Sequence, residues 1–204
     1  MKKAILGLAA FLMFSLTMNS GAQPVENAVL KKATFAGGCF WCMQPFFDRQ
    51  KGVTQTLVGY TGGQTANPTY EQVSTGTTGH AESIEITYDP QVITYDRLLD
   101  IYWRNIDPTV KDQQFSDHGS QYRTVIFYHD EQQKKTAEES RMKLGASGKF
   151  KKPIVTEILP ASVFYSAEDY HQKYYKKNAM HYQAYHMGSG RDNFFKKIWG
   201  KNNE

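Results

Sequence analysis

The chain contains two cysteines, Cys39 and Cys42, within the segment Gly37-Gly38-Cys39-Phe40-Trp41-Cys42. This segment lies where a short predicted strand ends and a predicted helix begins. A thiol in the first turn of a helix is close to unpaired backbone amides and to the positive end of the helix macrodipole, and both lower its pKa. The two glycines allow a tight turn that leaves the sulfur accessible. We therefore predict a reactive thiolate at Cys39 rather than a buried, inert cysteine.

The Cys-x-x-Cys spacing is compatible with redox chemistry, with half of a zinc site and with a structural disulfide. The chain has no second cysteine pair and its six histidines show no tight ligand spacing, so we expect no metal and no other cofactor. A disulfide across so short a loop removes little entropy from the unfolded chain, which disfavours a purely structural role. Phe40 and Trp41, between the cysteines, are either core residues or the wall of a pocket for an apolar group.

Glu82 is a second candidate for chemistry. In the predicted strand around it, period-two alternation places Glu82 with Ile84 and Ile86 on the face that should meet the core. Burial there would raise the pKa of the carboxyl group and let it hold a proton at neutral pH as a general acid. Alternatively, Glu82 lies at the strand end and its side chain reaches solvent. The pattern leaves both interpretations open.

The order of predicted elements indicates the fold class. It is β-α-β-β-α-β followed by a further helix and strand, which predicts an α+β fold. We expect a split βαβ (ferredoxin-like) core with a mainly antiparallel sheet, packed helices and long coil segments. The predicted strands are Ala33–Ala36, Val53–Tyr60, Ala81–Tyr88, Gln121–Tyr128 and Ile154–Leu159. The predicted helices are Cys39–Gln50, Tyr95–Arg104 and Glu131–Leu144, and Gly145 ends the last of them. We also expect a short helical turn at Tyr70–Ser74, a polar loop at Asp107–Gly119 and a partly helical tail from Ala167.

The N-terminal segment has the pattern of an export signal. Lys2-Lys3 precede an apolar run too short to span a bilayer, and small residues ending at Ala22 form a plausible cleavage site. We expect residues 1–22 to be a signal peptide, 23–31 a flexible leader and 32–200 a single domain, whose reductase character is what the family resemblance below implies. The mature protein would be exported to the periplasm or secreted. Cleavage of the signal peptide removes two lysines and lowers the net charge from +4 to +2, so we expect no nucleic-acid partner. Cleavage also removes the apolar run, so we expect no stable membrane insertion afterwards.

Several separated motifs resemble those of the peptide methionine sulfoxide reductase A family. The resemblance extends from about Lys32 to Trp199, and the number and order of the motifs make a chance match improbable. The motifs are Gly37–Trp41, Val58–Gly63, Asn67–Val73, Thr78–Glu82, Asp117–Arg123 and Ser189–Arg191. By themselves Tyr70, Asp117 and Tyr122 could be ordinary surface or core residues, and the resemblance is what makes them site candidates.

The resemblance implies a reaction on the S-epimer of methionine sulfoxide, free or in oxidised proteins. The Cys39 thiolate would attack the sulfoxide sulfur while Glu82 donates a proton to the oxygen, leaving a Cys39 sulfenic acid. Tyr70 and Tyr122 would hydrogen-bond that oxygen. Asp117 would shape the polar side of the site, and Phe40 with Trp41 would hold the substrate methyl group.

The same resemblance implies that a thioredoxin-like donor recycles the enzyme. Many relatives have glycine at the position of Cys42 and carry recycling cysteines near the C-terminus. This chain has no such cysteine, so Cys42 would attack Cys39 to form the disulfide that the donor reduces.

Two other functions remain compatible with the sequence. A general thiol–disulfide oxidoreductase would use Cys39 and Cys42 without Glu82 or Tyr70. A non-catalytic exported binding module would keep a structural disulfide and would function without either thiol.

Overall fold

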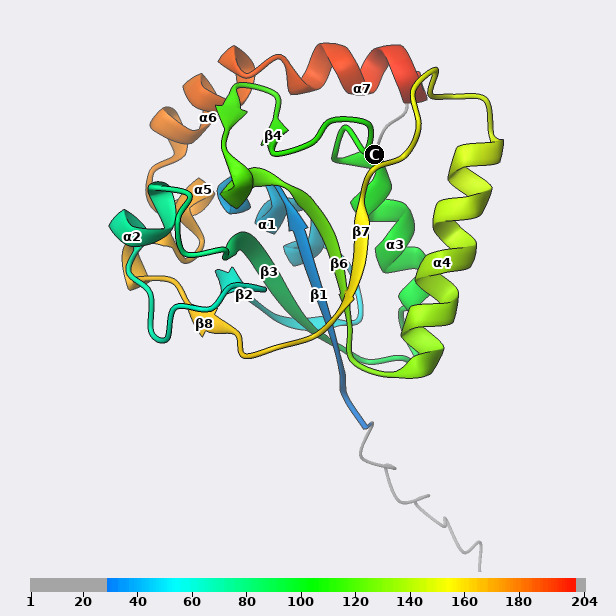
Figure 1. The fold of residues 1–204 in the computed structure, drawn as a ribbon, viewed down its shortest axis with the longest axis horizontal. Helices are drawn as coiled ribbons and strands as arrows, with labels where there is room; N and C mark the ends of the chain where they lie inside the picture. Colours follow the sequence, from blue (N-terminus) through cyan, green and yellow to red (C-terminus); the bar gives the residue numbers. More distant parts are fainter. Residues whose placement is uncertain (1–28, 201–204) are drawn as a thin grey trace, which may run out of the picture.

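The computed structural model describes residues 29–200, which form an α+β fold around a six-stranded mixed sheet (Figure 1). The strand order is β7-β6-β1-β3-β2-β8. Only β6 and β7 pair in parallel, and every other neighbouring pair is antiparallel. The strands are β1 (Lys31–Gly37), β2 (Val53–Thr61), β3 (Ala81–Tyr88), β6 (Thr124–Tyr128), β7 (Glu157–Pro160) and β8 (Tyr165–Ser166), and β4 (Gln113–Gln114) with β5 (Asp117–His118) forms a separate ribbon.

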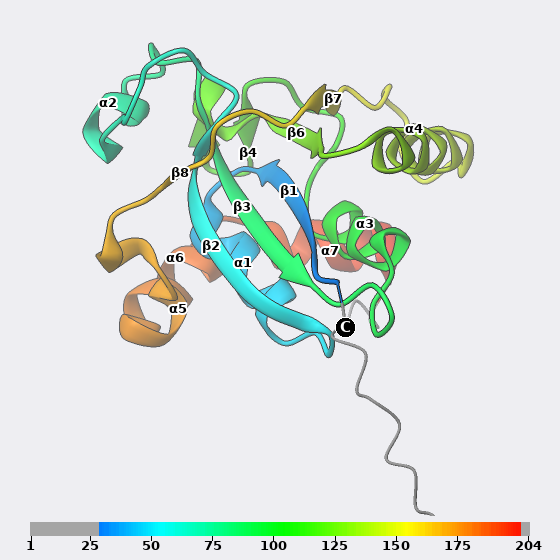
Figure 2. The ribbon, with the colours of Figure 1, turned by 90° about the horizontal axis from the view of Figure 1, so that it is seen from below.

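The helices surround this sheet, and α1 and α3 lie together on one of its faces (Figure 2). The apolar residues predicted for α3, including Leu98, Leu99 and Tyr102, are buried in the main core against Phe35 of β1. The helices are α1 (Phe40–Asp48), α2 (Tyr70–Ser74), α3 (Tyr95–Arg104), α4 (Glu131–Ala146), α5 (Tyr174–Lys177), α6 (Ala179–Gly188) and α7 (Arg191–Trp199), with short 3-10 helices η1 (Ser120–Tyr122) and η2 (Asp169–His171). In the part of the chain that the structure describes, no helix is long and apolar enough to cross a bilayer.

Several predicted boundaries are wrong, for local reasons. The strand predicted from Gln121 begins only at Thr124, because Gly119, with φ of +127°, starts the η1 turn. In this turn the Gln121 side chain donates to the Ser74 carbonyl at 3.2 Å, a contact that an extended chain would not make. Helix α4 continues through Gly145, since the Ser147 hydroxyl donates to the Leu144 carbonyl at 2.6 Å and caps the helix there.

The remaining differences concern strand β7, the predicted polar loop and the N-terminus. β7 begins at Glu157 rather than Ile154, because the Val155 amide donates to the Pro108 carbonyl at 2.8 Å instead of pairing with β6. The polar loop contains the β4–β5 ribbon. Lys31, the last residue of the predicted leader, already belongs to β1. The predicted signal peptide, and the leader up to residue 28, lie outside the described residues.

Candidate functional site

Cys39 lies at the junction of β1 and α1, where it is the N-cap residue of the helix. The turn before it depends on Gly38, whose φ of +82° L-residues rarely adopt. A Cβ at Gly38 would lie 2.5 Å from the Gln114 side chain, so the segment around β4 closes directly over this turn. The prediction that the Cys39 sulfur is accessible is therefore wrong, because only 7% of Cys39 is exposed.

Glu82 of β3 lies at this helix end. Its Oε2 accepts a hydrogen bond of 3.0 Å from the Phe40 amide, the first amide of α1. Only 2% of Glu82 is exposed, so the buried interpretation is the one that the structure supports. Burial raises the pKa of Glu82 well above its ordinary value, and the charge on Cys39 raises it further. Both effects favour the protonated carboxyl group, the form that has a proton to donate.

The protonation state of Cys39 differs from the prediction. Burial raises the pKa of its thiol well above the ordinary value, and a hydrogen bond with the Cys42 side chain acts in the same direction. The positive charge of Arg191 lowers the pKa without reversing this net shift. The predicted effect of the helix N-terminus is thus outweighed by desolvation, and the resting site holds a neutral thiol.

Cys42 lies one helical turn after Cys39, and its backbone amide donates to the Cys39 carbonyl at 3.0 Å. Both cysteines are free thiols, and both are buried. The two side chains lie one helical turn apart and interact with each other, which places one thiol where it can react with an oxidised form of the other.

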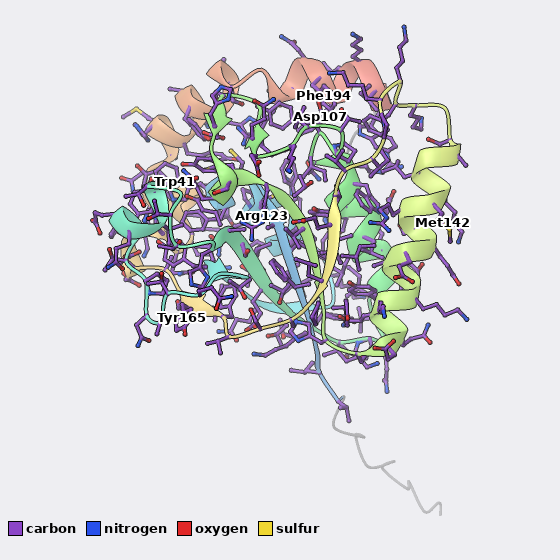
Figure 3. All side chains as sticks on the ribbon, in the orientation of Figure 1. Trp41, Asp107, Arg123, Met142, Tyr165 and Phe194 are labelled. Carbon is purple, nitrogen blue, oxygen red and sulfur yellow. The ribbon has the colours of Figure 1, made fainter. Side chains whose placement is uncertain are left out.

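Phe40 and Trp41 both contact His171 in the C-terminal segment, and Trp41 also contacts Tyr174. The Phe40 ring is buried, with its centroid 5.0 Å from the ring of His171 in η2. Trp41 stacks on Tyr174 of α5 at 3.8 Å, and its Nε1 donates to His171 Nδ1 at 2.9 Å. Figure 3 labels Trp41 on the side of the molecule where α2, α5 and α6 lie.

Tyr70 and Tyr122 come from α2 and η1, and both phenols lie within the electrostatic range of Glu82 and Cys39. Burial raises the pKa of each phenol, and the charges on Glu82 and Cys39 add to both shifts. Both hydroxyls therefore keep their protons at neutral pH and can donate hydrogen bonds.

Asp117 of β5 connects the site to the C-terminal helices. Its carboxylate accepts hydrogen bonds from the Tyr185 hydroxyl, at 2.7 Å to Oδ1 and 2.6 Å to Oδ2. Arg191 Nη2 donates to Oδ2 at 3.1 Å. The structure therefore brings all the residues predicted from the sequence to one region around Cys39.

Comparison with known proteins decides the family. Residues 31–203 match the family model of peptide methionine sulfoxide reductase. Peptide methionine sulfoxide reductase MsrA of Bacillus pumilus is 58% identical over 167 residues, which cover 82% of this chain and 94% of that relative. The chain belongs to the peptide methionine sulfoxide reductase family. It is an oxidoreductase that reduces methionine sulfoxide, which excludes the non-catalytic binding module.

Solved structures agree with this assignment. Reduced Mxr1 from Saccharomyces cerevisiae superposes with a TM-score of 0.70 and 33% identity, covering 74% of this chain and 86% of Mxr1. Mxr1 in complex with Trx2 superposes with a TM-score of 0.52 and 25% identity, covering 76% of this chain and 91% of that chain. Methionine sulfoxide reductase A of Corynebacterium diphtheriae superposes with a TM-score of 0.66 and 37% identity, covering 78% of this chain and 77% of that chain. The α+β fold of this reductase is thus that of a solved methionine sulfoxide reductase.

Several residues of the reductase site were not singled out by sequence reasoning. His171 is buried, and burial lowers its pKa to about 4, so its neutral ring accepts from Trp41 and packs 4.5 Å from the Tyr70 ring. Glu168 accepts from the Tyr60 hydroxyl and from the Tyr70 amide, both at 2.8 Å. No periodicity marks these positions, because they lie in coil and short 3-10 segments.

Tyr185 and Arg191 were also missed as site residues. Arg191 belongs to the Ser189–Arg191 motif, but the sequence predicted no role for it, and Tyr185 belongs to no motif. The side chain of Arg191 is buried, and its guanidinium lies 4.8 Å from the Phe115 ring centroid. A buried arginine is rare unless it is paired, so burial is the signal that identifies it.

Proposed function

We propose that this reductase acts on the S-epimer of methionine sulfoxide, free or in proteins, with Cys39 as nucleophile and Glu82 as general acid. The observation that carries the proposal is the hydrogen bond from the Phe40 amide to the buried Glu82 carboxyl group. This bond holds Glu82, a carboxyl group whose pKa burial raises well above its ordinary value, at Phe40, the residue that follows Cys39. A general thiol–disulfide oxidoreductase has no use for such an acid, whereas a sulfoxide oxygen must gain a proton when its bond to sulfur breaks.

The first step transfers oxygen from the substrate to the enzyme. The Cys39 thiolate attacks the sulfoxide sulfur, and Glu82 protonates the sulfoxide oxygen. The attack forms a bond between the two sulfur atoms. The protonated oxygen is then transferred to the Cys39 sulfur as the S–O bond of the substrate and the new sulfur–sulfur bond break, so methionine leaves and Cys39 becomes a sulfenic acid. Methionine sulfoxide is reduced by two electrons to methionine, and the Cys39 sulfur is oxidised by two.

The second step prepares the enzyme for reduction. The Cys42 thiol attacks the Cys39 sulfenic acid, water leaves, and a Cys39–Cys42 disulfide forms. A thioredoxin-like donor then reduces this disulfide by dithiol exchange. The proposal for the donor is supported by the solved complex of the yeast relative Mxr1 with Trx2.

The site has a polar and an apolar side, which accounts for the proposed choice of epimer. Tyr70 and Tyr122 would donate hydrogen bonds to the sulfoxide oxygen, and Asp117 would complete the polar side. Phe40 and Trp41 would hold the methyl group on the apolar side. Exchanging the two groups would bury the oxygen without a partner, at a cost of roughly 1–3 kcal/mol.

The test is an assay of the purified protein with dithiothreitol and each separated sulfoxide epimer. We expect methionine from the S-epimer and almost none from the R-epimer. Comparable turnover of both epimers would contradict the proposed orientation, and turnover of the R-epimer alone would reverse it.

We also propose that the protein is exported, to the periplasm or outside the cell, and starts at Gln23. The support is the lysine pair, apolar run and small-residue ending of residues 1–22. Cell fractionation with mass measurement of the intact protein tests this. Full-length protein in the cytoplasm would be incompatible with it.

For the fold, we propose that β1, α1, β2, β3, α3 and β6 form a split βαβ (ferredoxin-like) core. The support is the spatial strand order β6-β1-β3-β2 with antiparallel neighbours throughout. β7 and β8 are then additions to the two edges of this core.

A further inference from the structure

Arg191 is a buried cation close to the thiols. Only 1% of the residue is exposed, and its guanidinium is enclosed by the rings of Phe115 and Tyr185, whose centroids lie 4.8 Å and 5.7 Å from Cζ. The position that a Cβ would take at Gly38 lies only 3.5 Å from Arg191 Nη2. Arg191 therefore approaches the backbone of the residue that immediately precedes Cys39.

One side of this guanidinium is unused. Nη2 donates to Asp117 Oδ2 at 3.1 Å, but Nη1 is buried and has no hydrogen-bond partner within residues 29–200. An unpaired donor on a buried cation is costly, so such a group is retained where it meets an anion at some stage of function. The charge of Arg191 interacts with Cys42, Tyr185, Cys39 and Asp117. Of these groups, the thiols are the ones that must become anionic in the proposed reaction.

We propose that Arg191, the first residue of α7, supplies the positive charge that balances the thiolate of the Cys39–Cys42 pair. Helix α7 would thus contribute a residue that stabilises the nucleophile. This inference rests on the proposed role of Cys39. Asp117 already offsets part of the guanidinium charge, and it competes with the thiolate for Arg191. Removing Arg191 and removing the Asp117 charge therefore have opposite effects on thiolate formation.

Other titratable groups face the same thiol, and the experiment has to hold them constant. Burial and the Cys42 hydrogen bond raise the pKa of Cys39, Arg191 lowers it, and Asp117 raises it. The remaining neighbours are the carboxyl group of Glu82 and the phenols of Tyr70, Tyr122, Tyr182 and Tyr185, each of which interacts electrostatically with Cys39. Glu82 and these four tyrosines are unchanged in every variant below.

The test measures the rate at which iodoacetamide alkylates Cys39 as a function of pH, in a Cys42→Ser background so that one thiol is available. Adding Arg191→Gln should move the midpoint of the profile to higher pH by about 1–3 units, the effect expected of a nearby opposite charge. Arg191→Lys, which keeps the charge, should leave the midpoint closer to that of the background protein. Asp117→Asn should move it to lower pH.

A matched control removes an arginine elsewhere. Arg141 of α4 donates to the Thr156 carbonyl at 3.1 Å, so Arg141→Gln loses a charge and a hydrogen bond without touching the thiol pair, and its midpoint should not move. An unchanged midpoint in a folded Arg191→Gln protein would overturn the proposal. If that variant does not fold, Asp117→Asn decides: a downward shift supports the proposal, and no shift or an upward shift overturns it.

Methionine formation by the wild-type protein is measured alongside and separates the two proposals. If the wild-type protein produces no methionine from the S-epimer, the proposed function fails whatever the midpoints are. If it does, and the midpoints do not respond to the charge at position 191, only the role of Arg191 fails.

Discussion

Glu82 and Cys39 are both buried, and burial makes each side chain harder to ionise. Burial raises the pKa of both, and a negative charge on Cys39 raises the pKa of Glu82 further. The resting site is consequently a neutral thiol next to a carboxyl group whose pKa is shifted towards the protonated form. That arrangement holds the proton that the sulfoxide oxygen needs, but it also requires a compensating charge before Cys39 can act as a thiolate.

Replacing Glu82 by glutamine should slow the chemical step by about 10²–10⁴-fold, the usual contribution of a general acid. The amide keeps the shape and can still accept from the Phe40 amide, but it cannot donate a carboxylic proton. Methionine formed in a single turnover is the quantity to measure. Glu85→Gln on the same strand, where Glu85 pairs with Lys32 at 2.8 Å, is the control and should retain the wild-type rate. An unchanged rate in Glu82→Gln would mean that another group supplies the proton.

The substitution Glu82→Gln should also make the protein more stable relative to the wild-type protein as the pH rises. The folded-state pKa of Glu82 is raised, so its protonated form favours folding fully below the unfolded pKa, and this stability is lost as pH rises towards the folded value. Glu82→Gln has no such loss, so its advantage in unfolding free energy should grow by about 1.4 kcal/mol per pH unit within that window. Urea unfolding at several pH values measures this.

The control for this pH effect is Glu131→Gln, which removes a carboxyl group whose side chain is 85% exposed. Its unfolding free energy relative to the wild-type protein should not change with pH over the same range. A pH-independent difference for Glu82→Gln as well would show that Glu82 ionises normally in the folded state.

Cys42 should govern recycling and not the first chemical step. Cys42→Ser should yield about one methionine per enzyme with a thioredoxin-type donor and then stop, because the sulfenic acid has no partner thiol. Dithiothreitol can restore part of the turnover by attacking Cys39 directly, whereas Cys39→Ser should yield no methionine with any reductant. Quantifying methionine per enzyme tests both, and normal cycling of Cys42→Ser with the protein donor would refute the resolving role.

At the scale of elements, the β1–α1 turn determines where the nucleophile lies. Gly37 and Gly38 end β1, and the residue after them caps α1, so the turn aligns Cys39 with the Glu82 carboxyl group on neighbouring β3. Gln114 of β4 and Arg191 of α7 also lie close to this turn, at Gly38. Its geometry therefore requires both a positive φ and the absence of a side chain.

Gly38→Ala should lower the free energy of unfolding by about 1–3 kcal/mol through backbone strain, and by more through the clash with Gln114. Gly148→Ala is the matched control, because Gly148 also has a positive φ, of +70°, but nothing lies within 4 Å of the added Cβ. Thermal or urea unfolding of both variants separates strain from clash. Equal losses for the two variants would contradict the close approach at Gly38.

At the scale of the whole molecule, residues 173–199 form a cover over the thiols, here called the C-terminal cover. Tyr174, Tyr185 and Arg191 from this cover contact Trp41 or Asp117, and none of them is near Cys39 in the sequence. A network at the start of the cover holds it to α1. Asp48 accepts from the Tyr175 hydroxyl at 2.6 Å and from the Lys173 ammonium group, while the Lys173 amide donates to Gln44 at 2.8 Å.

Asp48→Asn should loosen this attachment. It removes the ion pair with Lys173 and weakens the bond from Tyr175, and lost hydrogen bonds of this kind cost about 1–3 kcal/mol. The opening of the cover should become about tenfold more frequent for each 1.4 kcal/mol lost, measured as faster amide exchange in α5 and α6. Asp169→Asn is the control, since Asp169 pairs with Lys177 at a fully accessible site and contributes little. Equal exchange in the two variants would contradict the anchoring role of Asp48.

The sequence by itself determined the family and the main elements. Motif spacing singled out Cys39 and Cys42, and period-two alternation made Glu82 a candidate without deciding whether it is buried, because both patterns are local properties of the chain. The apolar residues of α3 are detectable for the same reason. Boundaries failed where a long-range contact decided them, as at Gln121, whose side chain binds the Ser74 carbonyl.

Only the tertiary structure decided the protonation states and the composition of the complete site. The net pKa of Cys39 depends on how deeply it is buried, and burial results from the packing of segments far apart in the sequence. Arg191 follows Cys39 by more than a hundred residues, yet it lies against the turn at Gly38. Charge and desolvation act through space and not along the chain, so no local pattern could have assigned the electrostatics of this site.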